Sequence, residues 1–221
     1  MPHPQLQELT SKLNSGNTRD RILALVALRN LPTPDAVPLI KQGLYDDDLP
    51  VRSMAIRSLV SHSTAESLPL LVRLLEDPAY EIRAGAAGAL GQLGDDRAVQ
   101  PLTRAFLEDT DWLVRFSAAV SLGNLQDPRA YQVLLQALNH PEGIIQQAAI
   151  AALGEIKAID AIDALLQFVQ SEDWMVRQCL ATALGHLSSQ KSRSALNYLA
   201  KDDHPQVASA ATTALAQLHG V

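Results

Sequence analysis

The sequence predicts an all-α fold: a right-handed α-α superhelix, or solenoid, of seven helix pairs with a period of about 31 residues. The first observation is an apolar residue recurring at spacings of 31 or 32, namely Val51, Ile82, Val114, Ile145, Val176 and Val207. The second is a leucine eight residues after each of them, followed by glycine in four repeats. The third is the lack of the apolar–polar alternation typical of β-strands. Self-similarity at this period indicates a solenoid, in which each repeat buries its apolar face against its neighbours.

The repeats divide residues 1–221, taken as a single domain, approximately into 1–31, 32–62, 63–93, 94–125, 126–156, 157–187 and 188–221. Each begins with a short amphipathic helix, expected for example at 36–44, 98–107, 130–138 and 161–169. An acidic turn and a longer second helix follow, as at 80–93, 112–125 and 174–187. Asp48, Asp111 and Asp173 stand at N-cap positions of second helices, and Pro205 stands at a first helical position.

Aspartate and arginine recur six residues apart and predict a ladder of polar contacts along the stack. The pairs are Asp46 with Arg52, Asp77 with Arg83, and Asp109 with Arg115. In the fifth repeat His140 and Gln146 replace both partners, and the seventh keeps Asp202 without the arginine. Arg177 has Ser171 at the aspartate position, so we expect it to be the arginine free for a ligand.

The second helices predict a binding surface on the face opposite their packing seam. Counted from the recurring apolar residue at 100° per residue, positions −2, +2, +6 and +10 lie on that face, which lines the concave side of a curved stack. The candidate partner- or ligand-binding residues on or beside it are Tyr80, Trp112, Phe116, Val120, Trp174, Arg177, Gln178 and His186. Exposed contiguous apolar surface usually marks an interaction site, and the aromatic edge could also stack a flat conjugated ligand. The alternative is that the tryptophan rings fold over neighbouring turns and hold the helix starts together.

Composition restricts the class of partner and the compartment. The formal net charge is −6, from 24 acidic and 18 basic side chains, which argues against nucleic acid and anionic membrane surfaces as ligands. No apolar run approaches the roughly 20 residues that span a membrane, and residues 1–5 do not resemble the start of a signal peptide. A single cysteine, Cys179, allows no intramolecular disulfide. We therefore expect a cytoplasmic protein that does not insert into membranes.

The pattern Leu-x-Asp, Val-Arg, Ala, Ala-Leu-Gly resembles the HEAT repeat in its PBS-lyase variety and covers essentially the whole chain. Residues 107–125 (LEDTDWLVRFSAAVSLGNL) and 171–187 (SEDWMVRQCLATALGHL) more narrowly resemble the NblB family of phycobilisome-degradation proteins, which is related to the E/F-type bilin lyase subunits. The resemblance implies a scaffold that binds phycobiliprotein subunits and assists bilin detachment and phycobilisome degradation under nutrient stress. It implies no stably bound cofactor, with phycocyanobilin held at most transiently. A chromophore-transferring bilin lyase subunit and a general protein–protein adaptor are the alternatives.

Residues with catalytic chemistry are few, so whether the chain is an enzyme stays open. None of the six histidines precedes a glutamate, which argues against the HEAT-like di-iron deoxyhypusine hydroxylases, and no cluster has metal-ligand spacing. Cys179 could exchange a thioether-linked bilin, but small residues fill its position in other repeats, which favours a packing role. His186 is expected as a polar residue at the groove edge rather than as a general base. The pattern favours a non-enzymatic or bilin-detaching accessory protein over a catalyst.

Overall fold

A computed structural model describes residues 4–219 of the chain. It divides into two compact parts, an N-terminal part (Met1–Ala98) and a C-terminal part (Val99–Val221), each of which is described by itself. The described residues contain fourteen α-helices, which form seven pairs, and no strand. The predicted all-α solenoid of seven helix pairs is therefore confirmed.

The helices of the N-terminal part are α1 (Pro4–Leu13), α2 (Thr18–Ala27), α3 (Thr33–Gly43), α4 (Leu49–Ser61), α5 (Ser67–Leu74) and α6 (Tyr80–Leu93). Short 3-10 turns, η1 (Leu28–Asn30) and η2 (Asp96–Ala98), follow α2 and α6. Gly94 ends α6 with φ of 67°, a left-handed conformation that glycine adopts without steric cost. Helix α6 has the bounds that the sequence predicts.

The helices of the C-terminal part are α7 (Val99–Glu108), α8 (Trp112–Asn124), α9 (Tyr131–Ala137), α10 (Gly143–Glu155), α11 (Ile162–Leu165), α12 (Trp174–His186), α13 (Gln190–Leu199) and α14 (Pro205–His219). The 3-10 segments of this part are η3 (Pro128–Ala130), η4 (Ile159–Ala161) and η5 (Leu166–Phe168). The short helical segment expected over 161–169 is present, with α11 forming a single α-helical turn between η4 and η5. Pro205 is the first residue of α14, as predicted.

The acidic residues before the second helices act as N-caps in two of three predicted cases. Asp111 and Asp173 accept hydrogen bonds from the backbone N–H groups of Leu113 and Met175, at 2.9 and 2.8 Å. Asp48 stands at the N-cap of α4, but its carboxylate accepts hydrogen bonds from Thr18 and Arg21 and none from its own helix. Capping by the Asp48 side chain was therefore wrong, because the residue two positions on, whose N–H group the other two aspartates cap, is here Pro50, which has no backbone N–H.

The recurring apolar positions form the core. Val51, Ile82, Val114, Ile145 and Val207 are 0% exposed, and the leucines eight residues after the first four are equally buried. Burial of one such side chain stabilises the fold by about 1.5–3 kcal/mol. Leu215, the equivalent leucine of α14, is only half-buried.

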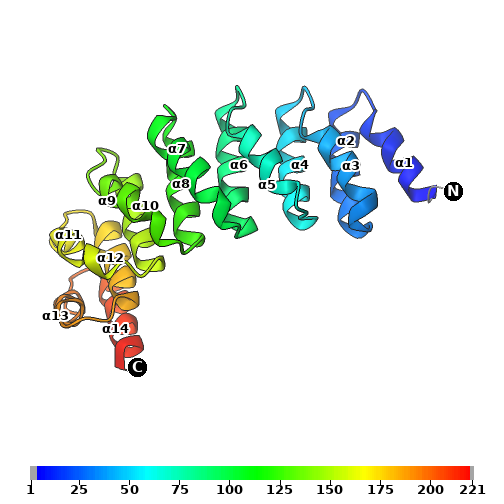
Figure 1. Cartoon of the computed structure of the whole chain (residues 1–221). Coiled ribbons are helices and arrows are strands. Elements are labelled where there is room, and N and C mark those ends of the chain that lie inside the picture. The colour runs from blue at the N-terminus through cyan, green and yellow to red at the C-terminus, as the bar shows by residue number, and fades with distance from the viewer. Residues whose placement is uncertain (1–3, 220–221) are drawn as a thin grey trace. The chain divides into compact units, whose positions relative to one another are not determined.

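Glycines set the curvature of the C-terminal part. A Cβ atom on Gly123 or Gly154 would lie 2.8 or 2.7 Å from the Cα atom of Ala152 or Ala183 on the next second helix, closer than such atoms can approach. Successive second helices therefore pack closely against one another, namely α8 on α10, α10 on α12 and α12 on α14. The first helices of neighbouring pairs contact one another little. The C-terminal part therefore bends toward its second helices, which lie on its inner side in Figure 1.

Candidate functional site

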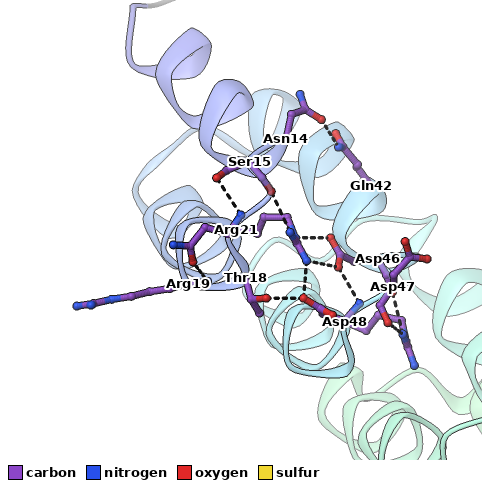
Figure 2. A network of polar contacts seen from close by, with 11 residues as sticks. Asn14, Ser15, Thr18, Arg19, Arg21, Gln42, Asp46, Asp47 and Asp48 are labelled. Atoms are coloured by element: carbon purple, nitrogen blue, oxygen red, sulfur yellow. Dashed lines mark hydrogen bonds and ion pairs between the residues drawn. The ribbon is translucent and has the colours of Figure 1, made fainter.

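Arginines of the second helices connect each repeat with the next along the acidic turns. Each guanidinium donates a hydrogen bond to the carbonyl oxygen six residues earlier. Carboxylates of the following repeat lie 2.9 Å away for Arg21–Asp46, 3.4 Å for Arg52–Asp77 and 2.7 Å for Arg177–Asp202. Figure 2 shows the first of these contacts, where Asp46 and Asp48 both face Arg21. The predicted ladder between repeats is confirmed, whereas within one repeat the arginine contacts the aspartate's backbone rather than its carboxylate.

Arg177 is part of this ladder and is not the free guanidinium that the sequence predicts. Its Nε and Nη2 atoms donate to the carboxylate of Asp202 at 2.7 and 2.9 Å, and Nη1 donates to the carbonyl oxygen of Ser171 at 2.6 Å. These hydrogen bonds hold the pKa of Asp202 below its ordinary value, and Asp202 holds the pKa of Arg177 above its own. The prediction was wrong because it compared residues of one repeat, whereas the carboxylate belongs to the next.

The fifth repeat carries a histidine where the other turns carry aspartate. His140 Nε2 lies 3.0 Å from Nη1 of Arg115, and His140 Nδ1 lies 3.2 Å from the backbone N–H of Glu142. Both neighbours are hydrogen-bond donors, and a neutral imidazole accepts only one hydrogen bond. In equivalent turns, one aspartate oxygen accepts the backbone N–H two residues on, as Asp46 and Asp77 do, and leaves the other for arginine. The imidazole of His140 can therefore accept a hydrogen bond from only one of these two donors.

We expect His140→Asp to raise the free energy of unfolding by about 0.5–1.5 kcal/mol, because the carboxylate satisfies both donors. Urea denaturation of the variant and the wild type measures this change. His186→Asp is the control, since His186 is exposed at the end of α12 and has no such pair of donors beside it. A His140→Asp protein that unfolds at lower urea than the wild type would show that the imidazole is the better fit.

The inner face of the C-terminal part exposes an apolar strip on α8, made of Trp112, Phe116 and Val120. Trp112 is 47% exposed and Val120 is 37% exposed, while Phe116 between them is half-buried. The three residues lie four apart, so they share one side of the helix. Trp112 and Val120 stay exposed although α8 packs against α10. The strip is a contiguous apolar surface that is available to a partner.

Two exposed residues that the sequence analysis missed extend this surface. Ile144 and Met175 are 43% and 44% exposed and lie in the first turns of α10 and α12, as Trp112 does in α8. Because α8 packs against α10 and α10 against α12, these two residues and Trp112 occupy the first turns of three adjacent helices, and they are called the N-terminal row. Both residues stand directly before the recurring apolar residue, at position −1. Residues seven apart differ by only about 20° in helical phase, so position −1 lies on nearly the same side of the helix as position +6 of the predicted binding face. This seven-residue offset from the predicted face was the sequence signal that could have identified Ile144 and Met175.

Trp174 differs from Trp112 although both occupy the same repeat position. Its indole stacks on the imidazole of His204, with ring centroids 4.0 Å apart and an interplanar angle of 12°. Trp174 is half-buried, and the contact joins the start of α12 to the turn before α14. For Trp174 the structure therefore has the alternative arrangement, in which the ring holds neighbouring helix starts together.

The other candidate residues are dispersed. Gln178 is half-buried on α12, His186 is exposed at the end of the same helix, and Tyr80 begins α6 in the N-terminal part with 43% exposure. Cys179 is half-buried, and burial raises the pKa of its thiol, so the reactive thiolate is disfavoured at neutral pH. The structure thus brings together Trp112, Phe116 and Val120 on one side of α8.

Residues 4–219 contain no group of three His, Cys, Asp or Glu side chains placed to hold a metal ion. None of the helices within that range combines the length and the hydropathy needed to cross a bilayer.

Comparison with known proteins identifies the repeat. The family model of HEAT repeats matches residues 6–87, 69–144 and 131–216. No curated protein sequence is significantly similar to the chain. The complex of CpcE and CpcF of phycocyanin lyase from Nostoc sp. contains a similar chain, with a TM-score of 0.61, 20% identity, and coverage of 99% of this chain and 96% of that chain. The YibA protein of Escherichia coli has a TM-score of 0.69 at 17% identity, over 98% of this chain and 82% of that one. At these identities the similarity concerns the fold alone.

Proposed function

Because the chain belongs to the HEAT-repeat family, we propose that it is a scaffold that binds a protein partner through the inner face of its C-terminal part. The exposure of Trp112, Ile144 and Met175 on three adjacent helices is the observation that supports this proposal most directly. Large apolar side chains in one patch are costly to leave in water, and aromatic residues are frequent anchors of protein interfaces. The proposed site is therefore the N-terminal row together with the apolar strip.

A phycobiliprotein subunit is the partner that we propose for this surface. The motifs at 107–125 and 171–187 support it, as does the similarity to the CpcE–CpcF lyase over nearly the whole length of both chains. In this proposal the scaffold holds the phycobiliprotein and assists detachment of its bilin, which leads to phycobilisome degradation. The high pKa of the Cys179 thiol argues against covalent transfer through that residue. A bilin lyase subunit remains the second candidate, favoured by the same fold similarity.

Mixing the protein with holo-phycocyanin tests the proposal. Co-migration on a sizing column supports a scaffold, and loss of visible bilin absorbance with release of free bilin supports detachment. Transfer of free phycocyanobilin to apo-phycocyanin would favour the lyase alternative. If the two proteins neither co-migrate nor change the absorbance, the phycobiliprotein proposal fails and a general adaptor remains.

We expect Trp112→Ala to weaken the binding of phycocyanin about thirtyfold or more, because truncation of an aromatic hot-spot residue costs about 2 kcal/mol or more. The exposed indole contributes little to the fold, so the unfolding midpoint should change little. Calorimetric titration and thermal denaturation measure the two effects. Tyr198→Ala is the matched control, since Tyr198 is 56% exposed but lies on a first helix, α13. Equal losses of affinity in both variants would contradict the assignment of the surface.

A further inference from the structure

The second-helix face of the N-terminal part has two adjoining grooves that the proposed function does not use. The groove between α2 and α4 has a volume of about 200 Å³ and is lined by Val26, Arg29, Met54, Arg57, Ser58 and Ser61. The groove between α4 and α6 has a volume of about 280 Å³, and its lining includes Arg57, Glu81, Gly85 and Gly88. The two grooves lie on either side of α4 and share Arg57 in their linings, and together they are called the depression.

The two arginines of this depression lack acidic partners. Within residues 4–219, Arg29 and Arg57 donate to no carboxylate, whereas ion pairs occupy Arg21, Arg52, Arg97, Arg104, Arg129 and Arg177. The protein has a net charge of −6, so carboxylates are in excess over basic groups. Two unpaired guanidinium groups at one groove are therefore an arrangement that attracts an anion from outside the chain.

The grooves beside these arginines are lined by apolar side chains and also by polar ones, among them Ser58, Ser61, Glu81 and Gln92. Val26 is 48% exposed at the edge of the first groove, and the Met54 side chain lines it. A Cβ atom on Gly88 would meet no atom within 4 Å, so the second groove is open at this position. A ligand for this depression needs a carboxylate for the arginines and an apolar group for the space beside Gly88.

We propose that this depression binds an acidic segment of a partner protein, in which a glutamate or aspartate carboxylate is held by Arg29 and Arg57. Guanidinium groups bind carboxylates through paired, charge-assisted hydrogen bonds, and the planar geometry suits this anion. Neighbouring apolar side chains of the segment cover Val26 and Met54 and enter the space beside Gly88. This surface belongs to the N-terminal part and acts independently of the inner face of the C-terminal part.

Fluorescence polarisation of the full chain with labelled synthetic peptides tests this proposal. The acidic probe alternates glutamate with leucine, and matched probes carry glutamine or lysine in place of glutamate. We expect the acidic probe to bind, the other two to bind at least about tenfold more weakly, and Arg57→Ala or Arg29→Ala to weaken the acidic probe by about tenfold. Arg57 is exposed, so circular dichroism should show the fold unchanged.

Arg19→Ala is the matched control. Arg19 is also exposed and without an acidic partner among the described residues, but its side chain points away from its neighbours in Figure 2 and does not line the depression. The proposal is overturned if the acidic and glutamine probes bind equally, if Arg57→Ala and Arg19→Ala have the same effect, or if the acidic probe does not bind. Tighter binding of a single-stranded oligonucleotide than of the acidic peptide would likewise overturn it in favour of a nucleic-acid ligand.

Discussion

Gly154→Ala is expected to lower the free energy of unfolding by about 1–2 kcal/mol, although alanine is ordinarily the better helix former. Its Cβ atom would lie 2.7 Å from the Cα atom of Ala183 and 3.3 Å from the carbonyl oxygen of that residue. Backbone atoms cannot rotate away as a side chain can, so α10 and α12 must separate. Overpacking of this kind costs about 1–3 kcal/mol, which exceeds the gain of about 0.5–1 kcal/mol from helix propensity.

Gly88→Ala supplies the matched control for this expectation. Gly88 lies inside α6, and a Cβ atom there would meet nothing within 4 Å. At this position only the higher helix propensity of alanine affects stability, and we expect the free energy of unfolding to rise by about 0.5–1 kcal/mol. Urea denaturation of both variants compares the two positions directly. If Gly154→Ala is as stable as Gly88→Ala, close approach of the second helices does not determine the packing of the C-terminal part.

Asp202→Ala is expected to lower the free energy of unfolding by about 2–3 kcal/mol, because it leaves the guanidinium of Arg177 without its carboxylate. The Arg177 side chain is 17% exposed and that of Asp202 is 8% exposed, so water replaces the lost hydrogen bonds only in part. Asp202 also accepts the backbone N–H of His204 at 2.9 Å, which fixes the turn before α14. Asp203→Ala is the control, since Asp203 is exposed and lies outside the ladder.

The contribution of Asp202 should also depend on pH. Its pKa in the folded state is lowered, chiefly by the hydrogen bonds from Arg177. A group whose pKa falls on folding stabilises the protein fully above its unfolded value of about 3.9 and loses this contribution as the pH falls through the folded value. The stability difference between wild type and Asp202→Asn should therefore be constant from neutral pH to about pH 4 and shrink below it. A difference that grows on acidification would contradict the assigned pair.

The comparison of Trp112 with Trp174 shows which part of the candidate site could be predicted. Helical phase places both residues at the same position, and phase depends only on the local chain. Their contacts depend on the residue about one repeat later, which is His204 for Trp174 and Glu142 for Trp112. The imidazole offers a flat ring on which an indole stacks, and the glutamate offers none. One tryptophan is consequently half-buried by stacking, whereas the other stays exposed.

The sequence by itself determined the helix pairs, their number and their core, because the spacing of apolar residues in an α-helix is a local property that recurs in every repeat. Only the tertiary structure decided that Arg177 pairs with Asp202, that His140 faces two donors, and that Trp112, Ile144 and Met175 form one row. These contacts join residues of different repeats, and their existence depends on how closely one second helix approaches the next. That distance is set by glycine–alanine contacts such as Gly154 with Ala183, which the chain makes only when it is folded.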